Sequence, residues 1–136
     1  MYEDLRLHPA VGMSLPRVVP AGGITIAEKN RSRCQPWVVH RSEEVYGEDV
    51  DAFRPERWMK EDNGDMHRFF FTFGGGAMMY LGRNISWMEM SKPIPTLTLH
   101  FDKELAEPEK QWRLKCWWFV MQQGVNVKLK PRRREV

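Results

Sequence analysis

The spacing of apolar positions predicts two helices. Residues 1–8 read as a short helix that stops at His8-Pro9, because the residue before a proline avoids the helical region. Residues 81–92 read as a second helix, since helical spacing puts four apolar side chains on one broad face: Leu81, Ile85, Met88 and Met90. Pro93 and Pro95 are expected to end or kink this helix, because each lacks a backbone donor and clashes with the preceding turn.

Strand patterns lie on either side of these helices. An extended piece covers residues 14–20, a turn covers 21–23, and the β-branched run Ile24–Ala27 predicts a strand. Residues 112–130 form a β-rich region, with a strand at Trp117–Val120, a turn at Gln123-Gly124 and alternation over Val125–Leu129. Residues 37–40 fit a buried strand or the entry to a helix, residues 43–58 are acidic and irregular, and residues 59–65 form a hydrophilic loop. The mixture predicts an α+β fold with short β-hairpins and irregular loops, in one domain of 136 residues.

Composition excludes several classes of protein. The chain is 42% hydrophobic and 29% charged, and its six Trp, seven Phe and three Tyr argue against disorder. No apolar run approaches the ~18 residues of a membrane span, and the acidic opening is unlike a signal peptide, so we expect a cytoplasmic protein. A net charge of +3, interspersed along the chain, does not indicate nucleic-acid binding. Cys34 and Cys116 form no disulfide framework or metal motif and are expected to be reduced thiols.

The glycine cluster Gly74-Gly75-Gly76 does not fit a nucleotide-binding loop. Gly82 is followed by Arg83-Asn84 where a phosphate loop has Lys-Ser/Thr, and Met79 replaces the third glycine of the dinucleotide fingerprint. The four histidines lack metal-ligand spacing, and the chain has no Gly-x-Ser-x-Gly elbow. We therefore predict no metal site and no catalytic residue from these motifs.

Three segments in order are more specific. Glu3-x-x-Arg6 is followed by Phe53-x-Pro55-Glu56-Arg57-Trp58 at residues 51–58, and then by Phe73-Gly74-Gly75-Gly76 and the helix at 81–92. This order resembles the carboxy-terminal part of a cytochrome P450, and more narrowly the fungal members similar to pisatin demethylase. The resemblance implies an incomplete haem-loop portion of that mainly-α fold, with the haem loop at 73–82 and the β region at 112–130.

The resemblance also assigns structural roles. It implies that Glu3 and Arg6 meet Arg57 in a core beneath the haem loop, where guanidinium groups give directed donors to a carboxylate and to loop carbonyls. It implies that Arg17 faces a haem propionate, with His40 as a weaker candidate for the same neighbourhood.

The chain departs from the family pattern at two positions of the loop. Tyr80 stands where the family has the haem-ligating cysteine, and Met78 stands where it has the propionate-binding arginine. An axial thiolate favours cleavage of the O–O bond. Free tyrosine has a pKa near ~10 against ~8.5 for cysteine, and Met78 supplies no cation to help it ionise. We expect haem in the parent family and none here, with Tyr80 as an iron ligand only if haem binds.

These departures leave three hypotheses. The first is a truncated, inactive monooxygenase remnant whose parent oxidised a small organic secondary metabolite. The second is a haem-independent module, a binding partner or catalyst, in a fungal secondary-metabolite pathway. The third, one piece of a longer reading frame that encodes an intact enzyme, does not explain Tyr80.

The family's upstream part carries its endoplasmic-reticulum anchor and distal helix, and we expect both to be missing. A haem-side surface is then expected to be exposed near Phe69–Phe71 and Trp87, where the chain would associate with itself or with a partner protein.

Overall fold

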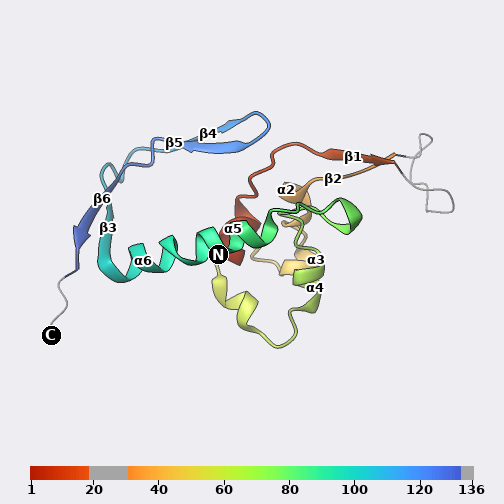
Figure 1. Cartoon of the computed structure of the whole chain (residues 1–136), viewed down its shortest axis with the longest axis horizontal. Coiled ribbons are helices and arrows are strands. Elements are labelled where there is room, and N and C mark those ends of the chain that lie inside the picture. The colour runs from red at the N-terminus through yellow and green to blue at the C-terminus, as the bar shows by residue number, and fades with distance from the viewer. Residues whose placement is uncertain (19–30, 133–136) are drawn as a thin grey trace. The chain divides into compact units, whose positions relative to one another are not determined.

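The computed structural model describes residues 1–18 and 31–132, and the predicted turn at 21–23 and strand Ile24–Ala27 lie outside them. The fold is α+β, as predicted, with short helices and two-stranded sheets (Figure 1). The chain divides into two compact units. Unit 1 comprises Met1–Met79 and Cys116–Val120, and unit 2 comprises Tyr80–Lys115 and Met121–Val136.

Unit 1 is built from short elements. It contains helices α1 (Tyr2–Leu7), α2 (Pro36–Val39), α3 (Glu43–Tyr46) and α4 (Gly64–Arg68), with 3-10 turns η1 (Pro55–Met59) and η2 (Gly76–Met78). Strands β1 (Leu15–Val18) and β2 (Arg31–Cys34) pair antiparallel, with Leu15 opposite Cys34, so the extended piece predicted at 14–20 includes a strand.

Two segments of unit 1 that were not predicted as definite helices are helical, each for a local reason. Pro36 occupies the first position of α2, where its fixed φ favours a helix. Of the two alternatives predicted for residues 37–40, a buried strand or the entry to a helix, the structure has the helix. In the segment predicted to be irregular, Glu43 and Glu44 lie in the first turn of α3, where the helix dipole favours negative charge.

The apolar core of unit 1 is small. Tyr46, Val50 and Met66 are buried together, with Val45 and Trp58 packed against them. The ring of Trp58 stacks on Tyr2 at 5.0 Å between centroids. The largest fully buried side chains of the described residues are mostly polar: Arg6, Arg57, His40, Glu3 and Pro9. Polar groups therefore fill much of the space that apolar side chains fill in most domains.

Of the strand predicted at Trp117–Val120, only Val120 lies in a strand. The observed strands are β4 (Arg113–Cys116) and β5 (Val120–Gln123), paired in a two-stranded sheet, and the aromatic residues form the turn between them. The amide of Trp117 donates to the Phe119 carbonyl at 3.2 Å, which closes this turn. Phe119 forms an isolated bridge with Val11, and the Val120 amide donates to the Ala10 carbonyl at 2.8 Å.

Unit 2 contains two successive helices and a two-stranded sheet. Helix α5 (Arg83–Ser91) passes through one residue, Lys92, into α6 (Pro93–His100), and Figure 1 shows the two helices end to end. The prolines end α5, as predicted, but they also begin a helix that the sequence did not predict. Pro93 and Pro95 lie in the first turn of α6, where their missing amide hydrogens cost nothing. Strands β3 (Phe101–Leu105) and β6 (Val127–Pro131) pair antiparallel.

Unit 2 lacks a buried core in the part of it that the structure describes, since each of its side chains is half-buried or exposed. Exposure was expected at Phe69–Phe71 and Trp87, but these four side chains are half-buried. The exposed apolar side chains of α5 and α6 are instead Ile85, Met88, Ile94, Leu97 and Leu99. No helix among the described residues has the length and apolar character to cross a bilayer.

Candidate functional site

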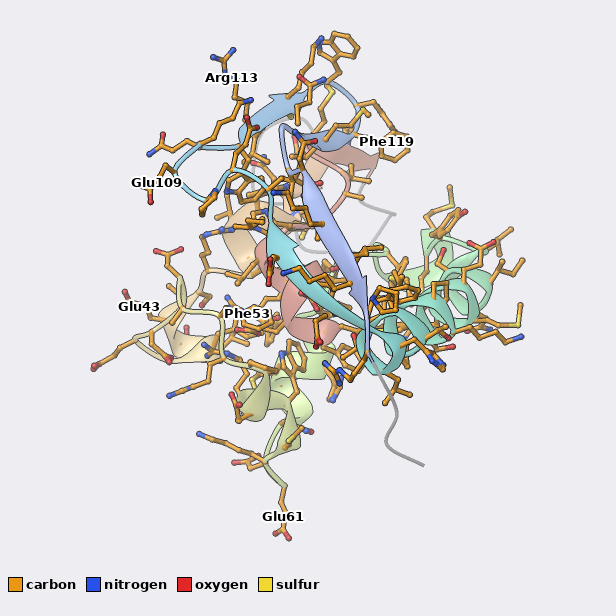
Figure 2. The ribbon with its side chains drawn as sticks, turned by 90° about the vertical axis from the view of Figure 1, so that its left-hand side faces the viewer. Glu43, Phe53, Glu61, Glu109, Arg113 and Phe119 are labelled. Carbon is orange, nitrogen blue, oxygen red and sulfur yellow. The ribbon has the colours of Figure 1, made fainter. Side chains whose placement is uncertain are left out.

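The interior of unit 1 contains a charge network, which we define as Glu3, Arg6 and Arg57. Surface charges such as Glu43 and Glu61 project away from the ribbon (Figure 2). The side chains of the network residues are buried instead: those of Glu3 and Arg6 are 0% exposed and that of Arg57 is 1% exposed. The structure thus brings together the three residues that the resemblance placed in one core.

The carboxylate of Glu3 accepts hydrogen bonds on both oxygens. Arg6 reaches it with two nitrogens, Nε to Oε2 and Nη2 to Oε1, each at 2.8 Å. The Arg57 Nε donates to Oε1 at 3.0 Å, and the backbone amide of Arg54 donates to the same oxygen at 3.1 Å. The indole of Trp58 donates to Oε2 at 2.8 Å. Each of these donors is oriented toward the ionised form of the carboxylate.

Both guanidinium groups also donate to backbone carbonyls. Arg6 donates to the His40 carbonyl at 2.8 Å and to the Ala52 carbonyl at 3.3 Å. Arg57 donates to the carbonyls of Tyr46 and of Asp49, the latter at 3.1 Å. The planar fork of an arginine presents five donors in fixed directions, so it can bind a carboxylate and carbonyls on different sides, whereas a lysine has three donors on one atom. The network therefore fixes the path of residues 46–57 around α1.

A second carboxylate lies at the edge of the network. Asp49 accepts from Arg57 Nη1 at 3.3 Å and forms an ion pair with the more exposed Arg54 at 3.0 Å. Two buried guanidinium groups are thus balanced by one buried and one partly exposed carboxylate. Because charges taken out of water are costly without partners, this balance is what allows Arg6 and Arg57 to be buried.

The environment of Glu3 strongly favours its charged form. Burial alone would raise the pKa of the carboxyl group, but the hydrogen bonds from Arg6, Arg54 and Trp58 outweigh it and lower the pKa from 4.5 to about 2. Burial also raises the pKa of Tyr46, whose hydroxyl donates to the Met66 carbonyl at 3.3 Å. Both groups keep one protonation state over the range in which most proteins work, so the arrangement is suited to support and not to proton transfer.

His40 is completely buried beside the network. Its Nδ1 lies 3.0 Å from the Arg6 carbonyl, and the amide of Phe71 donates to its Nε2 at 2.9 Å. Both ring nitrogens are therefore occupied by the backbone, and His40 has none left for the haem propionate that the resemblance suggested. Burial, together with the charges of Arg6 and Arg41, lowers the pKa of His40 to about 4.

Residues 73–79, which we call the glycine segment, follow directly after the His40 contact. Gly74 and Gly76 have φ values of +78° and +66°, which side chains with a Cβ adopt at a cost. At Gly75 the aromatic ring of Phe71 takes the space of a side chain, because a Cβ there would lie 2.7 Å from the ring. The Thr72 hydroxyl donates to the Leu5 carbonyl at 3.0 Å, which attaches the start of the segment to α1.

The other predicted site residues are not members of the network. Met78 ends η2 and is 71% exposed, and Tyr80, in unit 2, is 59% exposed. The Tyr80 ring lies against Gly82, where a Cβ would be 2.5 Å from its hydroxyl oxygen. The backbone of Arg17 is in β1, opposite Ser32.

Sequence reasoning found the three members of the network but missed partners that complete it. Trp58 stands in the quoted motif Pro55-Glu56-Arg57-Trp58, and its position next to Arg57 was a usable signal. Asp49, the amide of Arg54 and the carbonyl of Ala52 gave no signal, because backbone groups and a lone acidic residue in a polar stretch have no distinctive pattern.

Comparison with known proteins identifies the family. The sequence matches the Cytochrome P450 family model over residues 1–131. It is 42% identical over 137 residues to the cytochrome P450 monooxygenase cicH of Emericella nidulans, covering 96% of this chain and 28% of cicH. It is 39% identical over 136 residues to a pisatin demethylase of Fusarium vanettenii and 40% identical over 136 residues to the cytochrome P450 monooxygenase gsfF of Penicillium aethiopicum. Each of these two matches covers 96% of this chain. The matched part is 26% of the length of the demethylase and 27% of the length of gsfF.

The chain belongs to the cytochrome P450 family. This confirms the resemblance seen in the sequence. The chain spans about a quarter of the length of the curated relatives that it matches.

The family implies haem, and in the alignment that the resemblance implies the loop residues do not match the family's usual attachment. In that alignment Tyr80 would offer a phenol in place of the thiolate, and Met78 would offer no cation to a propionate. The Tyr80 ring lies against Gly82. Over residues 1–18 and 31–132, no three His, Cys, Asp or Glu side chains are grouped closely enough to hold a metal ion. We derive no chemistry through haem for this chain.

Proposed function

We propose that this chain is the haem-loop portion of a cytochrome P450 monooxygenase that has lost the family's oxidative chemistry and kept its structural scaffold. The parent activity in this proposal is oxidation of a small organic substrate of fungal secondary metabolism. The observation that carries the proposal is the pair Tyr80 and Met78, which replaces the thiolate and the propionate-binding cation of the loop.

The contrast between scaffold and loop supports this proposal. In the charge network, Glu3 and both arginines are hydrogen-bonded within unit 1. The two loop positions with the most chemistry are the ones that changed. A chain that still needs a stable fold but no longer activates oxygen is expected to lose reactive groups, as at positions 78 and 80. It is also expected to keep buried charges that stabilise the fold, as at Glu3, Arg6 and Arg57.

A second candidate function is a haem-independent interaction module. The exposed apolar side chains of unit 2 support it, since exposed apolar surface can mark an interface. Leu81 is 99% exposed, and Ile85 and Leu99 are each more than half exposed. In this candidate a second copy of the chain or a partner protein covers that surface.

One experiment separates these functions from a working monooxygenase. The chain is expressed with haem supplementation, its haem content is measured, and the carbon monoxide difference spectrum of the reduced protein is recorded. We expect no thiolate-type spectrum and no substrate oxidation with a reductase. Substrate-dependent oxidation by the unaltered chain would overturn the proposal.

Two variants and one measurement of size complete the test. Tyr80→Cys alone, and Tyr80→Cys with Met78→Arg, restore the two groups in order, and we expect neither variant to hydroxylate a substrate. Analytical ultracentrifugation of the unaltered chain tests the interaction module, which predicts an oligomer that dissociates on dilution. A monodisperse monomer with a cooperative melt contradicts self-association.

A further inference from the structure

The buried ring of His40 joins two segments that are far apart in the chain. It contacts the Arg6 carbonyl at the end of α1 through Nδ1 and the Phe71 amide through Nε2. The ring also lies parallel to that of Phe70, with centroids 5.3 Å apart and planes 7° apart. Three contacts of different kinds therefore fix both the place and the rotation of this imidazole.

These contacts define which nitrogen of His40 carries the hydrogen. A backbone amide can only donate, so Nε2, which faces the Phe71 amide, accepts and carries no hydrogen. A carbonyl can only accept, so Nδ1 carries the hydrogen and donates to Arg6. The guanidinium of Arg6 donates in return to the His40 carbonyl at 2.8 Å. His40 is thus a neutral imidazole in one tautomer.

Residues beyond Phe71 depend on this contact. The Phe71 ring covers Gly75, and the Gly74 amide donates to the Phe71 carbonyl at 2.9 Å, so the position of Phe71 sets that of the glycine segment. We propose that His40 is a positioning residue for the glycine segment: its neutral imidazole holds Phe71 against α1, and protonation of Nε2 releases the segment. This inference goes beyond the proposed function, because it requires neither haem nor a partner.

The charged and titratable groups around His40 oppose its protonation. Two cations lie near the ring: Arg6 in α1, and Arg41, the residue that follows His40. The Tyr46 ring in α3 meets the His40 ring edge-on, with centroids 6.2 Å apart, and stays neutral. Phe70 contributes only an apolar face. The carboxylate of Glu3 is already engaged by Arg6. Together with burial, these groups hold the pKa of His40 near 4, so the contact with Phe71 persists at neutral pH.

Two matched substitutions separate the two ends of the ring. In His40→Gln the side-chain amide oxygen can take the place of Nε2 and accept from Phe71. In His40→Asn the shorter amide can take the place of Nδ1 and donate to Arg6, but it does not reach Phe71. Hydrogen exchange of the Phe71 amide and of residues 73–79 is measured in the full chain. The Tyr46 amide, which donates to Ser42 at 2.9 Å in the same unit, is the internal reference.

We expect roughly tenfold faster exchange at Phe71 and the glycine segment in His40→Asn, the fold-change for one net hydrogen bond, with little change in His40→Gln. Equal exchange in the two variants, or faster exchange in His40→Gln, would overturn the proposal. Nitrogen NMR of the unaltered chain gives a second test that needs no variant. A hydrogen on Nε2 at neutral pH, or a Phe71 amide signal that does not follow the His40 titration, would also overturn it.

Discussion

Removal of the two buried arginines, singly and together, tests whether the charge network is one cooperative structure. The variants are Arg6→Ala, Arg57→Ala and the double variant. Arg6→Ala removes both nitrogens that contact Glu3 and the donor to the His40 carbonyl. Arg57→Ala removes the other guanidinium contact to Glu3 and leaves the carbonyls of Tyr46 and Asp49 without this donor.

The expected magnitude follows from burial. Each single variant breaks one of the two buried ion pairs of Glu3 and removes donors from buried carbonyls, which costs ~3–5 kcal/mol of unfolding free energy. The two arginines share the Glu3 Oε1 and the Ala52 carbonyl, so the cost of the double variant should differ from the sum of the two single costs. We expect a coupling energy of ~1–3 kcal/mol, as found for residues in one network. These costs are a large share of the ~5–15 kcal/mol that stabilises a typical domain.

The assay is urea unfolding followed by circular dichroism and tryptophan fluorescence, with Arg54→Ala as the matched control. Arg54 forms only an exposed ion pair through its side chain, and its backbone amide keeps its bond to Glu3 in the control. The control should therefore lose no more than ~1 kcal/mol. If the alanine variants do not fold, Arg6→Lys and Arg57→Lys are used in their place, because lysine keeps the positive charge and lacks the planar guanidinium group. Small and additive effects at positions 6 and 57 would refute the view of a single desolvated network.

Two further predictions concern acid stability and packing. The pKa of His40 falls on folding from 6.5 to about 4 and that of Glu3 from 4.5 to about 2, so the unfolded chain binds each of these protons first and acid destabilises the fold through both groups. Unfolding free energies from urea titrations should drop by on the order of 3 kcal/mol for each group, first as the pH falls from 6.5 to 4 and then as it falls from 4.5 to 2. The first drop should be absent in His40→Gln, and parallel curves for the two proteins would contradict this assignment. Gly12→Ala should destabilise unit 1 by ~1–3 kcal/mol, because a Cβ there lies 2.4 Å from the Cys116 sulfur, and Cys116→Ala should restore part of the loss in a thermal melt. An unchanged melting temperature in Gly12→Ala would contradict this prediction, because it would mean that the neighbouring side chains can move aside without loss of stability.

Much of the fold could be predicted where a residue type has one strong local effect. His8-Pro9 predicted the end of α1, and Pro93 predicted the end of α5. Helix α6 was not predicted, because the sequence does not distinguish a proline in the first turn of a helix from a proline that ends one, and Pro93 and Pro95 lie in the first turn of α6. The aromatic run at Trp117–Phe119 was read as a strand for its β propensity, although it forms a turn.

The candidate site shows a similar division. Glu3, Arg6 and Arg57 were predicted to meet through the family resemblance, since their spacing alone fits an ordinary surface pair. The partners of His40 were not predictable, because both are backbone groups whose positions depend on the tertiary fold. The roles suggested for Arg17, Met78 and Tyr80 remain predictions.

The sequence separations within the charge network have a consequence for the order of folding. Glu3 accepts from the Arg54 amide, Arg57 and Trp58, which are 51, 54 and 55 residues away. Closing loops of this length costs entropy before any contact is gained, so these bonds cannot guide the first stages of collapse. Arg6 meets Glu3 within α1, but a partly folded chain that buried Arg57 before Glu3 arrived would hold an unpaired charge, which is unfavourable. Intermediates of unit 1 should therefore keep the Arg57 guanidinium in water. During synthesis, helix α1 must wait until the ribosome has released Trp58 before the Glu3 carboxylate can reach its distant partners.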